Sequence, residues 1–218
     1  MSKRKHLTRT EIRRQRANRK LYTRIITIGI IVIAIGAIAW MVISSQLPKA
    51  ASEPTPPPMQ IDVTKQYFAT VKMAKGGEFV IQLYPDKAPI TVNSFVYLAR
   101  QGFFDGTTFH RVLEGFMAQG GDPTGTGMGG PGYQFVNEIN DLLFDKAGVV
   151  AMANSGRDTN GSQFFITFGP VSLAESDYTI FGQVISGMDV VNGITLRDPN
   201  ENPDYPGDMI ESVTITEE

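Results

Sequence analysis

The chain has 218 residues, with 20 Lys and Arg, 22 Asp and Glu, and a formal net charge of −2. It contains no cysteine, which excludes a disulfide framework, a thiolate metal site and a cysteine nucleophile. The chain has only two histidines, which argues against a metal site built from histidines. The length suffices for one ordinary domain with additional elements.

The charge is distributed unevenly along the chain. Residues 1–24 carry ten Lys and Arg against one Glu, a net charge of +9. The remainder holds 10 of the 20 basic and 21 of the 22 acidic residues, a net charge of −11. Because nucleic-acid-binding domains present basic surfaces, we expect no nucleic-acid partner for the main domain.

An uncharged apolar run follows the basic tail. Residues 25–43 are mostly Ile, Val, Ala and Gly, and such a run spans roughly 28 Å as a helix, close to the thickness of the hydrocarbon core. We therefore expect a single transmembrane helix over residues 25–44 that anchors the protein in the cell membrane. The preceding basic block predicts a cytoplasmic N-terminus and an extracytoplasmic main domain.

A cleaved secretory signal peptide is the alternative interpretation of this run. Its length, the long basic region and the lack of a closely following A-x-A site favour a retained signal anchor. In both interpretations the main domain is translocated. Nucleic-acid binding by the basic tail is a further alternative, but topology and attraction to anionic lipid suffice to explain it.

A proline-rich segment connects the apolar run to the main domain. Residues 45–62 contain five prolines and show no helix or strand periodicity, which favours an extended, semi-rigid spacer. The sequence thus predicts four parts. They are a basic cytoplasmic tail at 1–24, a transmembrane helix at 25–44, a Pro-rich linker at 45–62 and the main domain at 63–218.

The main domain begins with a predicted hairpin and a helix. Alternating apolar residues predict strands over 67–73 and 78–84. Residues 88–101 predict a helix with Pro89 in its first turn.

Short apolar segments separated by glycines follow, and each predicts a strand. These segments are 107–112, 115–119, 133–137, 149–153, 163–167 and 179–184. A short second helix is expected at 188–194 and a last strand at 209–216. Many short strands and only two helices indicate a mainly β domain, either a closed antiparallel barrel or a sandwich.

Residues 120–132 are glycine-rich and contain a formal G-x-G-x-x-G pattern at Gly125, Gly127 and Gly130. That pattern binds dinucleotides only between a strand and a helix N-terminus. Here no helical pattern follows it. We interpret the segment as a surface loop beside a groove and expect no cofactor.

A polar pair lies in the apolar segment 107–112. No G-x-S-x-G elbow accompanies His110, so we expect a structural hydrogen-bonding role for it rather than a hydrolase triad. Arg111 has apolar neighbours, and a desolvated cation needs a partner. A structural ion pair with Glu138 or Asp122 and a functional role are the two interpretations.

Two ordered motifs favour the functional role. The first comprises Phe-His-Arg-Val at 109–112, Gly-Phe-Met at 115–117 and Gln-Gly-Gly-Asp at 119–122. The second comprises Met-Ala-Asn at 152–154 and Asn-Gly-Ser-Gln-Phe-Phe-Ile at 160–166. Together they resemble the signatures of the cyclophilin family of peptidyl-prolyl cis/trans isomerases, over roughly residues 67–216. The resemblance implies a closed eight-stranded antiparallel barrel capped by two helices, and catalysis without a metal or cofactor.

The resemblance also implies site residues. Arg111 resembles the catalytic arginine, and Gln119 and Gln163 resemble the polar groups around it. Ala153 and Asn154 resemble the segment whose backbone pairs with the substrate, with Asn154 counted among the catalytic residues. Phe116, Met117 and Phe165 resemble the walls of the proline pocket. Gln163 is counted among the catalytic residues, and the other implied substrate-binding residues are Gln119, Ala153, Leu173 and Tyr178.

The chain departs from the family after the second motif and before Phe181-Gly182, which resembles part of the family's final block. Tyr178 takes the place of the family's histidine, and Leu173 takes that of its tryptophan or, with a one-residue insertion, its leucine. The only tryptophan is Trp40, in the apolar run. A contact that contributes to cyclosporin inhibition in the family is therefore missing.

We expect a monomeric, membrane-anchored prolyl isomerase that assists the folding of extracytoplasmic proteins and binds proline-containing polypeptides. The alternative is a non-catalytic barrel that docks proline-containing segments as a chaperone or scaffold. A degenerate member is expected to lose the arginine or the pocket residues, and this chain retains both. The enzyme is therefore the favoured interpretation.

Overall fold

The computed structural model describes residues 55–218. Its strands are β1 (Tyr67–Met73), β2 (Glu78–Leu83), β3 (Thr108–Phe109), β4 (Arg111–Leu113), β5 (Met117–Gly120), β6 (Val149–Met152), β7 (Phe164–Thr167), β8 (Ile180–Ser186) and β9 (Asp208–Glu217). Its helices are α2 (Pro89–Arg100) and α3 (Met188–Asn192), with 3₁₀ turns η1 (Glu175–Asp177) and η2 (Pro199–Glu201).

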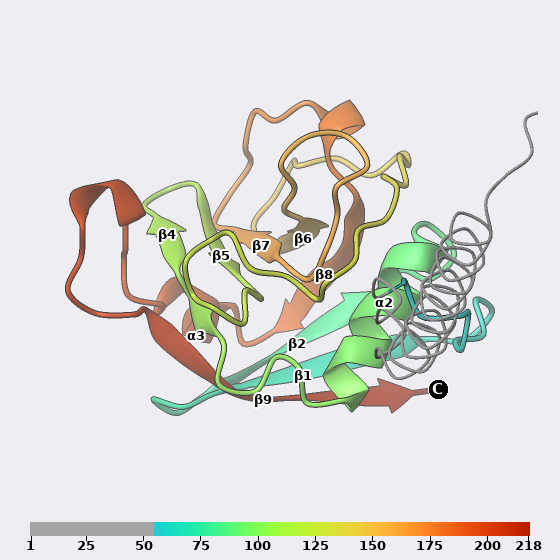
Figure 1. Cartoon of the computed structure of the whole chain (residues 1–218), viewed down its shortest axis with the longest axis horizontal. Coiled ribbons are helices and arrows are strands. Elements are labelled where there is room, and N and C mark those ends of the chain that lie inside the picture. The colour runs from blue at the N-terminus through green and yellow to red at the C-terminus, as the bar shows by residue number, and fades with distance from the viewer. Residues whose placement is uncertain (1–54) are drawn as a thin grey trace, which may run out of the picture. The chain divides into compact units, whose positions relative to one another are not determined.

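The strands form one nearly closed antiparallel barrel. They pair in the order β3-β9-β1-β2-β8-β6-β7-β5-β4, and the two strands at the ends of this order are consecutive in the chain. The sheet therefore curls until its edges approach each other, which leaves little exposed edge for unwanted pairing. Figure 1 shows β1, β2 and β9 side by side, with β4 and β5 on the other wall.

The number of strands differs from the predicted eight. Residues 107–112 were expected as one strand, but the structure divides them at His110 into β3 and β4. Strand β3 pairs with β9, whereas β4 pairs with β5. The chain thus changes pairing partner at His110, which connects the two edges of the nearly closed sheet.

The predicted strand at 133–137 is wrong. Only Phe135 makes a strand-like contact, an isolated bridge with Asn160. The backbone N–H groups of Asn137 and Glu138 donate instead to side chains, the Asp158 carboxylate and the Thr179 hydroxyl. Side-chain acceptors therefore replace a neighbouring strand, and the segment is a loop.

The other predicted elements are confirmed to within two residues at each end. Helix α2 buries an apolar face made of Val92, Phe95, Val96 and Ala99. The Phe95 ring lies among other buried aromatic rings, with centroid distances of 4.9, 5.6 and 5.4 Å to Phe104, Phe164 and Phe181. Such pairs add to the stabilisation that apolar burial provides.

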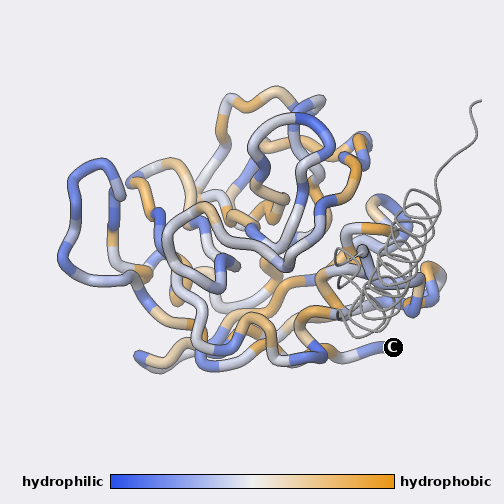
Figure 2. Tube along the Cα trace, viewed as in Figure 1, coloured by the Kyte–Doolittle hydropathy of each residue, from blue (hydrophilic) through white to orange (hydrophobic). Residues whose placement is uncertain are grey.

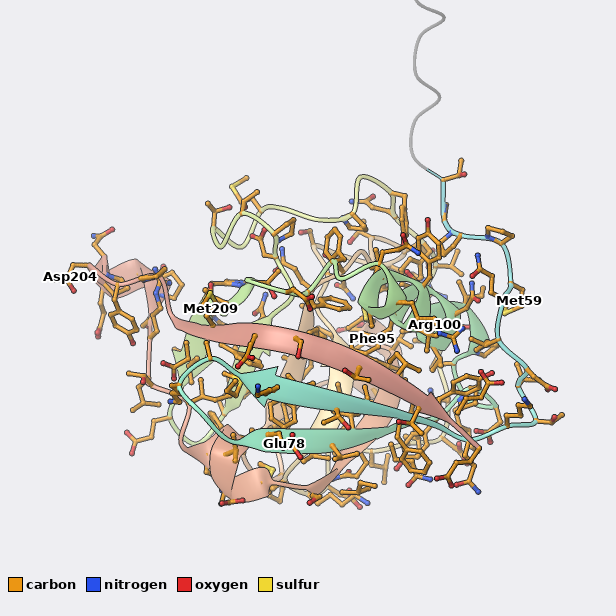
Figure 3. All side chains as sticks on the ribbon, turned by 90° about the horizontal axis from the view of Figure 1, so that it is seen from below. Met59, Glu78, Phe95, Arg100, Asp204 and Met209 are labelled. Atoms are coloured by element: carbon orange, nitrogen blue, oxygen red, sulfur yellow. The ribbon has the colours of Figure 1, made fainter. Side chains whose placement is uncertain are left out.

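Hydrophobic residues concentrate in the strands and in α2. Figure 2 shows the loop between α3 and β9 as mostly hydrophilic. Figure 3 shows α2 behind β1, β2 and β9, with Phe95 on the helix side of these strands. The barrel and helix α2 therefore share one hydrophobic core. The polar loops lie around them and contribute few residues to that core.

No helix within residues 55–218 is long and apolar enough to cross a membrane. The predicted tail at 1–24 and the predicted transmembrane helix at 25–44 lie outside the described residues, as does the linker up to residue 54.

The described end of the linker packs on α2 through one buried amide. The side-chain nitrogen of Asn93 donates to the carbonyl oxygens of Pro57 and Pro58, at 3.3 and 3.1 Å. The backbone N–H of Gln60 donates to the Asn93 side-chain oxygen at 2.7 Å. Asn93 is 3% exposed, so these bonds hold the linker where it meets the domain.

Candidate active site

Arg111, Gln119 and Phe165 lie in one row across three neighbouring strands. Arg111 on β4 is opposite Gln119 on β5, and Gln119 is opposite Phe165 on β7. Residues opposite each other in an antiparallel ladder project on the same face. Phe164, the neighbour of Phe165, belongs to the barrel core, whereas Phe165 belongs to a second cluster. The row therefore lies on the outer face of the barrel wall.

The Arg111 guanidinium rests on polarisable and polar groups rather than on a carboxylate. Its Nη1 makes a long hydrogen bond of 3.5 Å to Gln119 Oε1 and lies 4.0 Å from Met117 Sδ. Its Cζ lies 5.9 Å from the centroid of the Phe116 ring, within the range of a cation–π contact. The guanidinium is thus oriented while its charge remains free to act on another group.

The structural ion pair considered for Arg111 is absent. Among residues 55–218, no carboxylate lies within 4.0 Å of its guanidinium nitrogens. The Glu138 carboxylate accepts from Ile90 and Thr91 at the start of α2. Asp122 accepts from the backbone of the glycine-rich loop. Both candidate partners are therefore engaged elsewhere.

The residues assigned to the proline pocket gather in one apolar cluster beside Arg111. Its buried members include Met117 and Phe165, and Phe116, Ala153, Leu173 and Tyr178 pack against them. The rings of Phe165, Phe144 and Tyr178 contact one another, with centroid distances of 5.8 Å from Phe165 to Phe144, 5.6 Å from Phe165 to Tyr178 and 6.2 Å from Phe144 to Tyr178. Leu173 and Tyr178 flank the 3₁₀ turn η1, which brings both to the cluster.

Sequence reasoning missed several members of this cluster. Leu113, Phe144 and Val171 also belong to it. Phe144 stacks on Phe165 with an interplanar angle of 22°, so it fixes the plane of the ring that the pocket presents. It comes from a segment without strand or helix periodicity, and no sequence signal indicated its place.

The two glutamines form a hydrogen-bonded pair behind Arg111. Gln119 Nε2 donates to Gln163 Oε1 at 2.9 Å, and Gln163 Nε2 donates to the carbonyl oxygens of Gly127 and Gly129, both at 2.9 Å. The glycine-rich loop expected beside a groove is therefore confirmed, and it contacts the site through Gln163.

An open cavity of about 680 Å³ adjoins the glutamine pair. Its walls are Gln119, Gln163, Ala153, Asn154 and the loop from Gly127 to Gln134. These walls are mainly amide, backbone and hydroxyl groups, whereas the cluster around Phe165 is apolar. The site thus combines an apolar pocket and a polar cavity, with Ala153 belonging to both.

The Asn154 backbone is available to another chain. Among the described residues, neither its N–H nor its C=O forms a hydrogen bond with a backbone group. Its side chain donates to the Asp177 carbonyl at 2.9 Å and accepts from the Gly156 N–H at 3.1 Å. The residue is therefore fixed by its side chain while its backbone can pair with an extended segment.

His110 does not have the hydrogen-bonding role expected for it. Its side chain is buried, and neither ring nitrogen has a hydrogen-bond partner among residues 55–218. Burial lowers the pKa of His110, against the opposing effect of the Asp122 charge.

No group of three or more His, Asp or Glu side chains in this part of the chain converges to hold a metal ion.

Comparisons with known proteins agree with this geometry. The family model described as cyclophilin type peptidyl-prolyl cis-trans isomerase/CLD matches residues 68–215. Peptidyl-prolyl cis-trans isomerase-like 1 of Homo sapiens is 47% identical over 141 residues, which cover 63% of this chain and 84% of that protein. Peptidyl-prolyl cis-trans isomerase A of Mycobacterium tuberculosis is 48% identical over 161 residues, covering 64% and 87%.

Solved structures that match this fold also include cyclophilin-type isomerases. A cyclophilin type peptidyl-prolyl cis-trans isomerase of Cryptosporidium parvum matches with a TM-score of 0.63 and 33% identity, covering 69% of this chain and 98% of that one. A second structure of that protein, crystallised in the presence of the dipeptide Ala-Pro, matches with a TM-score of 0.62 and 32% identity, covering 68% and 98%.

Proposed function

Because this chain belongs to the cyclophilin-type peptidyl-prolyl cis-trans isomerases, we propose that it rotates X-Pro bonds in the site formed by Arg111, the glutamine pair and the Phe165 cluster. The Cryptosporidium parvum relative has a crystal structure determined in the presence of the dipeptide Ala-Pro, which supports a proline-containing segment as the ligand. The observation that carries the proposal is a guanidinium that has no ion-pair partner among residues 55–218, is oriented by Gln119 and lies beside an apolar pocket.

The reaction requires stabilisation of a twisted peptide bond. The rotation barrier is about 18–20 kcal/mol because resonance gives the C–N bond partial double-bond character. No covalent bond breaks, so the enzyme needs to bind the twisted state more tightly than either planar state. In the twisted state the prolyl nitrogen becomes pyramidal and regains a lone pair.

Arg111 supplies the interaction that only the twisted state makes. Its guanidinium donates a hydrogen bond to the prolyl nitrogen, which offers no lone pair in the planar states. The guanidinium is planar and permanently charged, and Gln119, with its 3.5 Å contact to Nη1, orients it. Catalysis thus follows from a fixed donor rather than from proton transfer.

The Phe165 cluster binds the proline ring. Phe116, Met117 and Phe165 present apolar surface, and burial of such surface contributes about 25 cal/mol per Å². Met117 adds a polarisable sulfur that adapts to the ring. The Asn154 N–H and C=O, which have no backbone partner among the described residues, pair with the substrate backbone. One side of the X-Pro bond is then held while the other rotates.

Catalysed turnover distinguishes the enzyme from a proline-binding scaffold. The purified full-length chain is mixed with about a hundredfold molar excess of an X-Pro peptide, and cis/trans relaxation is followed. Uncatalysed relaxation takes tens to hundreds of seconds, so acceleration of the whole peptide pool is the expected result. Saturable binding without acceleration would instead support the chaperone or scaffold alternative.

The proposal also includes the location of the domain. The basic tail at 1–24 and the apolar run at 25–44 support a single-pass anchor with a cytoplasmic N-terminus. The domain at 63–218 then acts outside the cytoplasm on exported or unfolded proline-containing polypeptides, as a monomer on the linker at 45–62. The bonds from Asn93 to Pro57 and Pro58 support a defined exit of the linker beside α2.

Protease accessibility tests this topology. In intact spheroplasts of cells that produce the chain, added protease should degrade the isomerase domain and leave a membrane-bound N-terminal fragment. In sealed inside-out vesicles the domain should survive. Protection of the domain in spheroplasts would overturn the proposed orientation. It would not bear on the proposed isomerase activity.

A further inference from the structure

Asp122, two residues after the end of β5, is a buried carboxylate that holds the glycine-rich loop from Thr124 to Gly129. Its side chain is 0% exposed. Oδ1 accepts from the Thr124 backbone N–H at 2.7 Å and from the Thr124 hydroxyl at 2.8 Å. Oδ2 accepts from the N–H groups of Gly127 and Gly129 at 2.6 and 3.1 Å. The carboxylate thus uses both oxygens, and no cation within residues 55–218 forms an ion pair with it.

The same two glycines connect Asp122 to the active site. Gly127 and Gly129 turn their N–H groups to Asp122 and their carbonyl oxygens to Gln163 Nε2. Gly127 has a φ of +84°, which favours glycine. A Cβ on Gly129 would lie 2.0 Å from Asp122 Oδ1. The loop therefore needs glycine at both points to approach the carboxylate on one side and the amide on the other.

The hydrogen bonds permit only one orientation of the amides. Arginine is a pure donor, so Gln119 must present its oxygen to Arg111 and its nitrogen to Gln163. Gln163 then presents its oxygen to Gln119 and its nitrogen to the loop, which must offer carbonyl oxygens. The loop can do so because Asp122 engages the N–H groups. Each hydrogen bond in this series therefore determines which atom of the next group donates and which accepts.

We propose that Asp122 is a positioning residue for Arg111, acting through Gly127, Gly129, Gln163 and Gln119. This inference rests on the proposed function. Asp122 touches neither the guanidinium nor the substrate pocket. Its effect is transmitted from Oδ2 to Nη1 by a path of four hydrogen bonds of 2.6–3.5 Å, which runs through either Gly127 or Gly129. Removing the carboxylate frees the loop and leaves the two amides without a fixed orientation.

The ionisation of Asp122 is consistent with this role. Burial tends to raise its pKa, but the hydrogen bonds from Thr124, Gly129 and Gly127 outweigh burial and hold the pKa of this carboxyl below its ordinary value. The group is therefore a pure acceptor at neutral pH, as four converging donors require.

The substitution Asp122→Asn tests the relay in the full-length chain. The amide nitrogen that replaces one carboxylate oxygen would place a hydrogen-bond donor against the N–H donors of the loop. We expect kcat to fall about tenfold, the scale of one lost hydrogen bond, with little change in peptide Kd. Side-chain NH₂ protons of Gln119 and Gln163, observed by NMR, should lose their protection from solvent exchange.

A double-mutant cycle separates the relay from a general loss of stability. In a Gln163→Met background the relay is already broken, so Asp122→Asn should reduce kcat by less than about twofold more. Glu138→Gln is the matched control, because that carboxylate also accepts two backbone N–H groups and a threonine hydroxyl. It should leave kcat unchanged in both backgrounds.

The milder Thr124→Val carries the test if Asp122→Asn does not fold, because Thr124 is exposed. It should lower kcat a few-fold in the wild-type background and not in Gln163→Met. The relay would be overturned if Asp122→Asn left kcat or the NH₂ protection unchanged. It would also be overturned if the loss of kcat were as large in the Gln163→Met background as in the wild type. A wild-type chain without isomerase activity would overturn the proposed function, whereas the NH₂ protection would still report on the relay.

Discussion

At the scale of single residues, the site depends on side chains that alternate between the two faces of a strand. Phe164 packs into the barrel core and Phe165 into the outer cluster. The resemblance of the two motifs to the family implied Phe165 and its polar neighbours as site residues, and the alternation of adjacent strand residues explains why Phe165 faces the site while Phe164 is in the core. It could not predict Phe144, whose position depends on a loop fold rather than on periodicity.

Tyr178 is expected to act through its ring rather than its hydroxyl. The ring meets Phe165 edge-on, with an interplanar angle of 85°, and within residues 55–218 its hydroxyl forms no hydrogen bond. Tyr178→Phe should therefore leave the KM for an X-Pro peptide unchanged. Tyr178→Ala should raise KM about three- to tenfold or more, because it removes the aromatic pairs with both Phe165 and Phe144, each worth about 0.5–1.5 kcal/mol. Steady-state kinetics of both variants decide this, and a large defect in Tyr178→Phe would show that the hydroxyl matters.

At the scale of elements, α2 begins without a capping side chain of its own. Its N-cap residue, Ala88, makes no side-chain hydrogen bond. Glu138 from a distant loop accepts instead from the N–H groups of Ile90 and Thr91, at 2.9 and 2.7 Å. A negative charge at this end also interacts favourably with the helix dipole. The sequence predicted the helix from its apolar face and Pro89, but a cap from so far along the chain has no local signal.

Removal of this cap should destabilise the fold without affecting catalysis. Glu138→Ala is expected to lower the free energy of unfolding by about 1–2 kcal/mol, the usual cost of losing a helix N-cap. Glu211→Ala is the control, because it removes only an exposed pair with Lys72 and should cost less than about 1 kcal/mol. Urea unfolding of the three proteins provides the comparison, and equal stabilities would refute the role of Glu138.

The division of one predicted strand into β3 and β4 belongs to the same scale. Apolar alternation indicated a strand over 107–112 but not which neighbour each half would pair with. That choice depends on closure of the whole barrel, because β3 pairs with β9 and β4 with β5. The nine predicted segments thus lose the one at 133–137 and gain one by this division, so the structure has nine strands, one more than the eight that the resemblance implied. The mainly β barrel and both helices were predicted correctly.

At the scale of the whole molecule, global stability should depend on the protonation of His110. Burial lowers its pKa in the folded state, whereas the unfolded state retains the ordinary value of about 6.5. As pH falls below that value, the unfolded state binds a proton that the folded state does not. Stability is therefore complete above about pH 6.5 and decreases as pH falls toward the folded-state pKa.

Urea unfolding at pH 7.5 and pH 5.0 measures this loss. Wild-type protein should be less stable at pH 5.0, and His110→Phe should show a smaller difference between the two values. The substitution is expected to be tolerated at pH 7.5, because the ring nitrogens have no partner within residues 55–218. An identical pH dependence in the two proteins would assign the effect to other groups.

The central claim is that Arg111 stabilises the twisted peptide bond and not the bound planar substrate. NMR exchange spectroscopy on a saturating X-Pro peptide measures the catalysed cis/trans rate and the Kd with the same full-length protein. We predict that Arg111→Ala lowers the exchange rate about a hundredfold or more, with Kd changed by less than about threefold. Arg100→Ala, which removes an exposed arginine paired with Glu217, should match wild type. An undiminished exchange rate in folded Arg111→Ala, or a loss explained entirely by weaker binding, would contradict the account.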